Sequence, residues 1–387
     1  VDTLRDDQSV PLEEIEGRLW FLSDRSAELQ REWRDIQPGS NDERQVLADV
    51  LREFIQTSDP RTTVYGTKQV RASVSLVYGG YQRSLRSGQG DLEVEFRFVS
   101  PNDFAAERES AQSESLKPEA ARKVVALAAL DPATKNDIRD AYASSKMRTD
   151  LRKRTLDGDE DEFYRSLDDR NRTARQRIAD AMSQALTNGS VIYHGQNTAV
   201  KHAASSFDAA LTNALTEVGK EVFSSFPHAA VKPNEGAAEK IVKASDTSIL
   251  SKQEDPLNLF GGGQGDAFND SAPAVVDVKD YVRNQGSVKG SELLDDFARP
   301  PYGWNKDVTR YVIAAMFRAS HLALRINGDP VTTTTQAVID GFKSNRAFGQ
   351  IGVEPPPEPP EQAVMLRAQQ ALSELTGSGM KAILRDL

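Results

Sequence analysis

The sequence predicts an α+β fold that is mainly helical, built from a small α/β unit, a charged long helix or helical hairpin, and a winged-helix-like module. Three observations lead to this prediction. Apolar and charged residues alternate strictly over residues 91–98, which is typical of a half-buried strand. Residues 133–188 have a helical pattern with a highly charged middle. A strongly apolar helical stretch precedes Asn327-Gly328, the strongest two-residue signal for a β-hairpin.

The first part of the chain, residues 1–59, is predicted to be a wing and helices that close an upstream domain. The stretch from Leu12 to Ile36 alternates around a hairpin tip at Glu16-Gly17 and then becomes helical. A second helix is predicted from about Asp42 to Ile55, where apolar residues fall at helical spacing.

Residues 60–145 are predicted to form a small α/β domain. An alternating run from Val70 to Tyr78 reads as a strand, and the alternation over residues 91–98 predicts the next one. The continuously apolar run from Val124 to Leu130 fits a buried strand, after which Asp131-Pro132 opens a helix.

The segments that follow are predicted from their composition. Residues 146–231 form a helical region, in which the charged stretch 148–177 is a solvated arm or a helical hairpin. Residues 232–271 have weak patterns and are predicted to be a flexible linker with Gly261-Gly262-Gly263 as its joint. Residues 351–387 are predicted to be a Pro-rich linker and a terminal helix.

The winged-helix-like domain is predicted over residues 272–350. Ser291 caps a short helix, and Asn305 caps the next one, whose apolar residues fall on one buried face. The alternation that leads into Asn327-Gly328 then predicts a two-stranded wing.

Composition limits the class of protein. The 387 residues are enough for two to four domains, and 38% hydrophobic with 27% charged residues fits a soluble globular protein. No window approaches the ~20 apolar residues of a membrane helix. The absence of cysteine excludes disulfides and suits a cytoplasmic bacterial protein. The net charge of −10 argues against attraction of DNA to the whole surface, but a local basic patch stays open.

No catalytic, cofactor-binding or metal-binding residue is predicted in this chain. The glycines of residues 261–265 lack the Lys-Ser/Thr pair of a P-loop. The acidic run from Asp157 to Asp161 lacks the glycine of an EF-hand loop, because Glu162 occupies that position. The four histidines lie too far apart for a local metal site, and Gly-x-Ser-x-Gly is absent. The chain alone is therefore not predicted to be an enzyme.

Two interpretations of the winged-helix-like domain stay open. If its apolar helix reads a major groove, basic residues near the helix ends and on the wing would contact phosphates. On a winged helix that docks proteins the same residues are ordinary surface charges, and acidic neighbours such as Asp295 and Asp296 favour that interpretation. The predicted nucleic-acid or partner contacts are Tyr302, Trp304, Lys306, Arg310, Arg318, Arg325, Lys343 and Arg346.

Several stretches resemble the large P-loop protein of BREX phage-resistance systems, the BrxC/PglY family. The central one is Pro300-Pro301-Tyr302-Gly303-Trp304, with the apolar helix and short hairpin that follow it. Residues 17–33 look like the wing and helix that close the ATPase part of that family. Residues 124–141 look like its strand, proline and helix, and residues 215–229 like its helix with spaced phenylalanines.

The resemblance implies a role in bacterial phage defence, beside other defence-system proteins that methylate and restrict DNA. In that family the nucleotide-binding motifs lie upstream, so ATP and Mg²⁺ are expected in a missing part and no cofactor in this chain, which starts at Val1 and looks cut at both ends. We expect a cytoplasmic, non-catalytic region of a BREX-type ATPase that docks protein or DNA and does not contact the membrane. Homo-oligomerisation stays open. The alternatives are a self-associating helical scaffold unrelated to defence and an unrecognised hydrolase.

Overall fold

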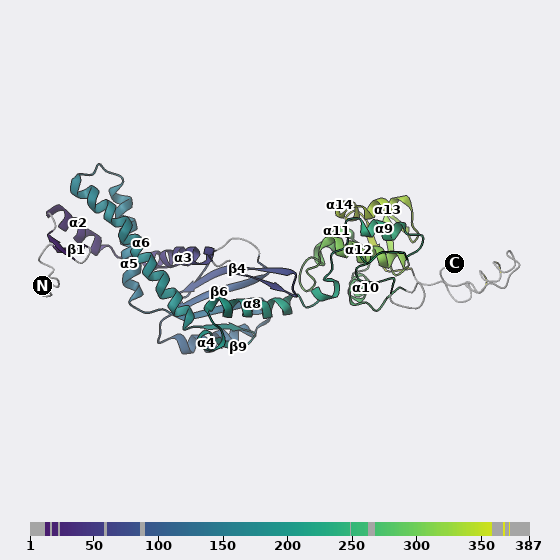
Figure 1. The fold of residues 1–387 in the computed structure, drawn as a ribbon, viewed down its shortest axis with the longest axis horizontal. Coiled ribbons are helices and arrows are strands. Elements are labelled where there is room, and N and C mark those ends of the chain that lie inside the picture. Colours follow the sequence, from purple (N-terminus) through teal and green to yellow (C-terminus); the bar gives the residue numbers. More distant parts are fainter. Residues whose placement is uncertain are drawn as a thin grey trace. The chain divides into compact units, whose positions relative to one another are not determined.

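The computed structural model divides into two compact units, residues 1–222 and residues 223–387 (Figure 1). The structure describes residues 12–15, 18–21, 24–57, 60–85, 90–247, 249–261 and 268–357, together with residues 367 and 371. The fold is α+β and mainly helical, as predicted. Among the helices in these ranges, none combines the length and the apolar character needed to span a membrane.

The N-terminal unit is built on a mixed seven-stranded sheet in the order β3-β4-β6-β7-β8-β9, with β5 also paired to β4. The strands of this sheet are β3 (Arg61–Val64), β4 (Lys68–Tyr78), β5 (Tyr81–Ser84), β6 (Leu92–Val99), β7 (Lys123–Ala129), β8 (Ser190–Tyr193) and β9 (Gln196–Ala199). A separate hairpin pairs β1 (Leu12–Ile15) with β2 (Arg18–Phe21), as predicted.

Helices cover both faces of the sheet (Figure 1). The helices of this unit are α2 (Asp24–Asp35), α3 (Ser40–Thr57), α4 (Phe104–Ser115), α5 (Thr134–Leu151), α6 (Gly158–Thr187), α7 (Val200–Ala203) and α8 (Phe207–Val222), with a 3₁₀ turn at Pro118–Ala120. Of these, α2 packs on α5 and α6 rather than on the sheet. The strands β4, β6 and β7 are parallel, and α4 makes the crossover between β6 and β7 that parallel pairing requires. The other pairings in the sheet are antiparallel.

One face of the sheet has an apolar core under α8. Phe96 on β6 packs against Phe207 on α8 with their ring centroids 5.9 Å apart. Farther along α8, a Cβ atom at Gly219 would lie 2.9 Å from Val64, so the absence of a side chain there lets the helix approach β3 closely. The strands predicted over residues 91–98 and 124–130 are therefore confirmed, and α8 supplies the apolar face they need.

The opposite face of β6 carries a buried ionic network, which the alternating pattern did not predict. Arg97 donates from Nε to Glu95 (2.7 Å), and its Nη atoms contact Glu107 (2.7 Å) and Glu114 (3.0 Å) on α4. Lys123 on β7 donates to the second oxygen of Glu95 at 2.9 Å. Burial alone would raise the pKa of Glu114, but the hydrogen bond from Arg97 holds it below its usual value. The strand was predicted to be half-buried, yet its charged face lies under α4.

The charged stretch after β7 folds as a helical hairpin of α5 and α6, one of the two predicted forms (Figure 1). Asp157 begins α6 with a capping box, in which its side chain accepts from the N–H of Glu160 and Glu160 reaches back. Trp33 on α2 donates from Nε1 to Ser144 on α5 at 3.0 Å. The apolar core of the hairpin consists of Leu29, Trp33, Ala143, Met147, Leu151, Phe163 and Leu167.

The C-terminal unit has the element order of a winged helix. Its elements are a 3₁₀ turn (Phe226–Ala229), α9 (Ala237–Lys243), α10 (Pro273–Gln285), β10 (Val288–Lys289), α11 (Gly290–Asp296), α12 (Lys306–Arg318), β11 (Ala323–Ile326), β12 (Asp329–Val331), α13 (Gln336–Phe342), α14 (Asn345–Phe348) and β13 (Gly352–Glu354). The predicted turn joins β11 to β12, and both central residues have positive φ, 53° at Asn327 and 94° at Gly328. The wing is thus confirmed.

Three predicted segment boundaries are wrong. Residues 232–271, predicted as a flexible linker, contain α9, which packs on α12. Position 351, predicted to begin a Pro-rich linker, leads directly into β13, the strand that lies between β10 and β11. The boundary at residue 145 falls inside α5. At the first two places the local sequence pattern is weak, and contacts between segments distant in sequence decide the structure, whereas the boundary at residue 145 divides a stretch whose pattern is helical on both sides. The predicted terminal helix and Gly262-Gly263 lie outside the described ranges, apart from residues 367 and 371.

Replacement of Arg97 by alanine tests the ionic network. We expect the Arg97→Ala change to destabilise the N-terminal unit by about 3 kcal/mol, because the buried carboxylate of Glu95 keeps a single cation, Lys123. Urea denaturation followed by circular dichroism, with hydrogen exchange of the β6 amides, measures the loss. The control is Arg172→Ala, which breaks the exposed pair with Asp169 and should cost about 0.5 kcal/mol or less. Equal losses in the two variants would contradict a buried network.

Candidate functional site

The helix predicted to face a partner, α12, is enclosed by its own unit. Every residue from Val308 to Phe317 is buried. Helices α9, α10, α11 and α14 all pack against α12. A helix that is covered all round belongs to a core, whereas a helix that reads DNA must expose one face to the groove. The predicted apolar stripe is therefore real, but the opposite face is covered as well.

A polar network lets α12 bury the charged side chain of Arg310. Arg310, 4% exposed, donates from Nη1 to Asn345 on α14 at 2.9 Å, and its Nη2 lies 3.1 Å from Asp307. Asn345 in turn donates to Asp307 at 3.1 Å. Burial lowers the pKa of Arg310, against the opposing charges of Asp307 and Glu235. Arg310 Nε and the hydroxyl of Thr309 have no hydrogen-bond partner within the described ranges. This predicted contact residue is thus part of the interior.

The aromatic turn before α12 also points inward. Trp304 is 2% exposed and donates from Nε1 to the carbonyl oxygen of Ser225 at 3.1 Å. Phe297 contacts both predicted aromatic residues, with centroid distances of 4.3 Å to Tyr302 and 4.9 Å to Trp304. The turn therefore anchors the segment at Ser225 to the helical core, and Tyr302 is left half-buried.

An adjacent aromatic residue, Tyr281 on α10, closes this cluster. Its ring lies 5.3 Å from that of Phe297, and its hydroxyl donates to Asp296. Burial, and then the hydrogen bond to Asp296, raise the pKa of Tyr281 to about 12. The phenol therefore stays protonated well above the ordinary range for tyrosine.

Two of the predicted cations near α12 are engaged within the unit. Lys306, at the start of the helix, donates to Asp295 at 2.5 Å. Arg318, at its end, donates from Nε and Nη2 to the carbonyl oxygen of Ala244 at 3.1 and 3.0 Å. The Arg318 contact ties the end of α12 to the residue that follows α9, so this side chain holds together two segments that are distant in sequence.

The other three predicted cations lie on the wing and beyond it. Arg325 on β11 is in an ion pair with Glu354 on β13 at 2.6 Å. Lys343 is exposed and contacts Asp340 at 2.7 Å. Arg346 is exposed, and no side-chain contact is recorded for it within the described ranges. Lys343 and Arg346 lie at the junction of α13 and α14, a surface that we call the cationic corner. Whether any predicted residue contacts a partner stays a prediction.

Sequence reasoning missed a buried anchor between Asp255 and Tyr311. Tyr311 donates its hydroxyl to Asp255 and accepts from the N–H of Leu257 at 3.2 Å. Asp255 also accepts from the N–H groups of Leu259 and Phe260, both at 2.9 Å. Burial raises the pKa of Tyr311, and the hydrogen bond to Asp255 adds to the shift. The Asp-Pro step at 255–256 was the available signal, because Asp often organises a turn through its own side chain.

A hollow in the N-terminal unit bears on the hydrolase alternative. It has a volume of about 400 Å³ and lies beyond the ends of the parallel strands, where ligands of α/β folds often bind. Of its acidic side chains, Asp103 accepts from Ser100, Glu107 from Arg97, and Asp131 from a backbone N–H. The described residues contain no group of side chains suited to a metal ion. The geometry thus gives these carboxylates structural roles.

Comparison with known proteins matches the C-terminal unit alone. Residues 238–354 match the family model described as the BREX ATP-binding protein BrxC winged helix-turn-helix domain. The matched range starts within α9 and ends with β13, so it includes part of the segment predicted as a linker. No curated protein and no solved structure matches the chain.

The anchor between Tyr311 and Asp255 is tested by the Tyr311→Phe change. We expect a loss of about 2 kcal/mol in the stability of the C-terminal unit, because a buried carboxylate loses a donor. Hydrogen exchange of the α12 amides measures it. Tyr302→Phe is the matched control and should leave exchange nearly unchanged, since no hydrogen bond of the Tyr302 hydroxyl is recorded in the described ranges. Unchanged exchange in Tyr311→Phe would exclude an anchoring role.

Tyr281 predicts an alkaline dependence of stability. Its folded pKa of about 12 exceeds the unfolded value of about 10, so its contribution is complete below pH 10 and is lost as the pH rises toward 12. We therefore expect the difference in unfolding free energy between the wild type and Tyr281→Phe to shrink over that range. Urea titrations at a series of pH values measure the difference. A difference that stays constant with pH would show that the folded phenol has an ordinary pKa.

Proposed function

We propose that this chain is a BrxC-family protein of BREX-associated defence, because residues 238–354 match the BrxC winged helix-turn-helix domain, and that its C-terminal unit docks another protein of the same system. The docking is non-catalytic and takes place in the bacterial cytoplasm. The family description names an ATP-binding protein, but the glycines of residues 261–265 lack the Lys-Ser/Thr pair of a P-loop. ATP and Mg²⁺ therefore have no proposed role at this site.

The enclosure of α12 is the observation that carries the proposal. In a winged helix that reads DNA, side chains of the recognition helix reach base edges in the major groove. Here the residues from Val308 to Phe317 are all buried, so they cannot reach a groove without unfolding the unit. The helix that a DNA-binding winged helix would expose is thus covered here by other helices of the unit. This favours contact with a partner through another surface, the cationic corner.

The charges of the unit favour a protein partner as well. Affinity for DNA grows with the number of phosphates that lysine and arginine neutralise. Arg310 is buried, and Lys306, Arg318 and Arg325 are held by partners in the same unit. The cationic corner offers Arg346, together with Lys343, whose ion pair is with Asp340, three residues earlier, and the whole chain has a net charge of −10. Two cations attract a phosphate backbone only weakly, but they are sufficient for a peripheral contact with an acidic patch on a protein.

Binding of the purified full chain to each other protein of its BREX system tests the proposal. We expect one of them to bind with an affinity measurable by calorimetry. Reversal of both charges in the corner, Lys343→Glu with Arg346→Glu, should weaken that binding about tenfold, because two favourable contacts become repulsive. The control reverses two exposed cations on other segments, Lys252→Glu with Arg283→Glu, and should have little effect.

Two results would overturn the proposal. One is that none of the purified proteins of the system binds the chain. The other is salt-sensitive binding of DNA at about 50 mM salt that Lys343→Glu with Arg346→Glu abolishes, because this would assign the corner to DNA. Lys306→Glu is a suitable further variant for the DNA assay, whereas Arg310 is buried and its replacement would disturb the fold.

A further inference from the structure

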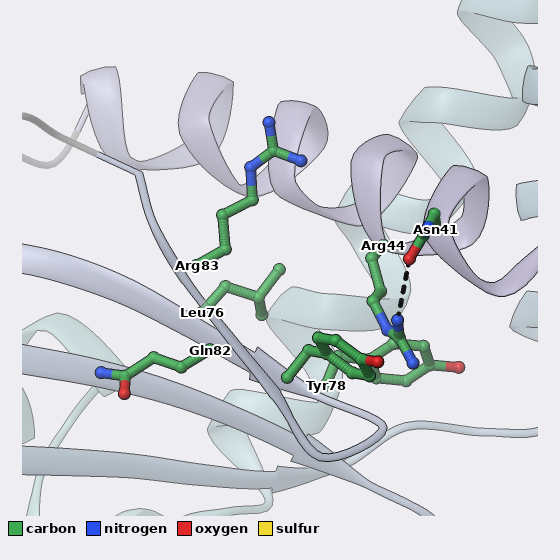
Figure 2. Close-up of a pocket in the computed structure, with 7 residues that line it drawn as sticks. Asn41, Arg44, Leu76, Tyr78, Gln82 and Arg83 are labelled. Carbon is green, nitrogen blue, oxygen red and sulfur yellow. Dashed lines mark hydrogen bonds between the residues drawn. The ribbon is translucent and has the colours of Figure 1, made fainter.

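A second hollow of the N-terminal unit lies between the start of α3 and the β4–β5 edge of the sheet (Figure 2). Its volume is about 280 Å³. Figure 2 shows Arg44 reaching down from α3 and Arg83 rising from β5 toward the helix, with Leu76 between them. The hollow is lined by Asn41, Arg44, Leu76, Tyr78, Tyr81, Gln82 and Arg83.

The pairing of β4 with β5 explains why these side chains converge. Leu76 is opposite Arg83, and Tyr78 is opposite Tyr81. Directly opposed residues point to the same face of a sheet, and positions two residues apart also share a face, about 7 Å apart along the strand. Two cross-strand pairs therefore face α3 together. The intervening residue, Gln82, points to the other face, where it donates to Ser75.

Arg44 is held in place before any ligand arrives. Its guanidinium carbon lies 3.7 Å from the centroid of the Tyr81 ring, a cation–π contact. Nη1 donates to Asn41 at 3.1 Å, and Nη2 donates to the carbonyl oxygen of Gly79 at 3.3 Å. Gly79 has a φ of 57°, which a side chain would strain, so the tight turn that offers this carbonyl depends on glycine.

Arg83 supplies a second cation on the opposite side of the hollow. No hydrogen bond or ion pair of its side chain is recorded within the described ranges, and the side chain is exposed. The hollow thus has two guanidinium groups, one fixed and one without a recorded partner.

The phenol of Tyr78 adds a donor. Burial, and then the charge of Glu43, raise its pKa, although the charge of Arg44 acts in the opposite direction. The hydroxyl therefore stays protonated at neutral pH and is able to donate to an anion. Leu76, which is 2% exposed, lies at the bottom of the hollow, and Tyr78 and Tyr81 supply its aromatic lining.

We propose that this hollow binds the phosphate group of a small phosphorylated molecule, between Arg44 and Arg83. Guanidinium groups match phosphate oxygens with paired N–H donors, and such charge-assisted hydrogen bonds are the strong ones. The aromatic lining of Tyr78 and Tyr81 receives the organic part of the ligand. A volume of about 280 Å³ restricts that part to a small group, since ordinary ligand pockets begin at about 300 Å³. This site is in the N-terminal unit and does not depend on the docking proposed above.

Isothermal titration calorimetry of the full chain at low salt tests the site, with inorganic phosphate and phenyl phosphate as the two probes. We expect both to bind, and phenyl phosphate to bind more tightly, because its ring packs on the aromatic lining of the hollow. Arg83→Gln should weaken both about tenfold, because it removes a charge-assisted hydrogen bond from a side chain with no recorded structural partner. Arg61→Gln, on the neighbouring strand β3, is the control: Arg61 is also exposed and should leave both affinities unchanged.

Three outcomes would overturn the inference. The first is that neither probe binds at about 1 mM. The second is binding that Arg83→Gln does not weaken, and the third is equal weakening by Arg61→Gln, which would indicate general attraction by surface charge. Circular dichroism melting of both variants confirms that any loss is not caused by unfolding. If phenyl phosphate binds no more tightly than inorganic phosphate, the part of the inference that seats an organic group in the hollow is overturned.

Discussion

The complete burial of α12 is the constraint on which the C-terminal unit depends. A helix with one apolar stripe needs one packing partner, whereas a helix covered on every side needs neighbours all round. Each of its buried polar groups also needs a hydrogen-bond or ion-pair partner. Arg310 is satisfied in part by Asn345 and Asp307, and Tyr311 by Asp255. These contacts recruit α14 and residues 249–261, so the burial of one helix determines where both segments lie.

In the N-terminal unit too, a buried charged side chain needs partners from other segments, but there it lies on a strand rather than on a helix. The charged face of β6 lies under α4, and Arg97 is compensated there by Glu95 together with two glutamates of α4. A buried cation without such partners would destabilise the fold by several kcal/mol, roughly 3–5 when a pair is broken. In both units an arginine that sequence alone would place on the surface becomes a connector between distant segments. Its charge is then no longer available to a ligand.

This redistribution of charge shapes the functional interpretation. Of the predicted contact residues, Trp304 and Arg310 are interior, and several others hold the unit together. The exposed surface that remains among the predicted contact residues is the cationic corner, Lys343 and Arg346, at the junction of α13 and α14. In the N-terminal unit the situation is reversed, because Arg83 faces a hollow without a recorded partner in the described ranges. A free cation beside a preformed cavity suggests recognition, whereas an exposed cation on a helix is usually only solvated.

Local patterns in the sequence determined the type of most elements, and long-range contacts determined their burial. Alternation over residues 91–98 and the pair Asn327-Gly328 specify a strand and a turn whatever surrounds them, because pleat and backbone dihedrals are properties of the local chain. The Pro-Pro-Tyr-Gly-Trp turn likewise lies within residues 238–354, the range that matches the BrxC winged helix-turn-helix domain. The packing of α9 and of residues 255–257 on α12, and the place of β13 between β10 and β11, depend on partners distant in sequence. The burial of Arg310 also depends on partners distant in sequence. The residue type fixes the charge of a side chain, but its desolvation depends on neighbours that only the tertiary structure brings together.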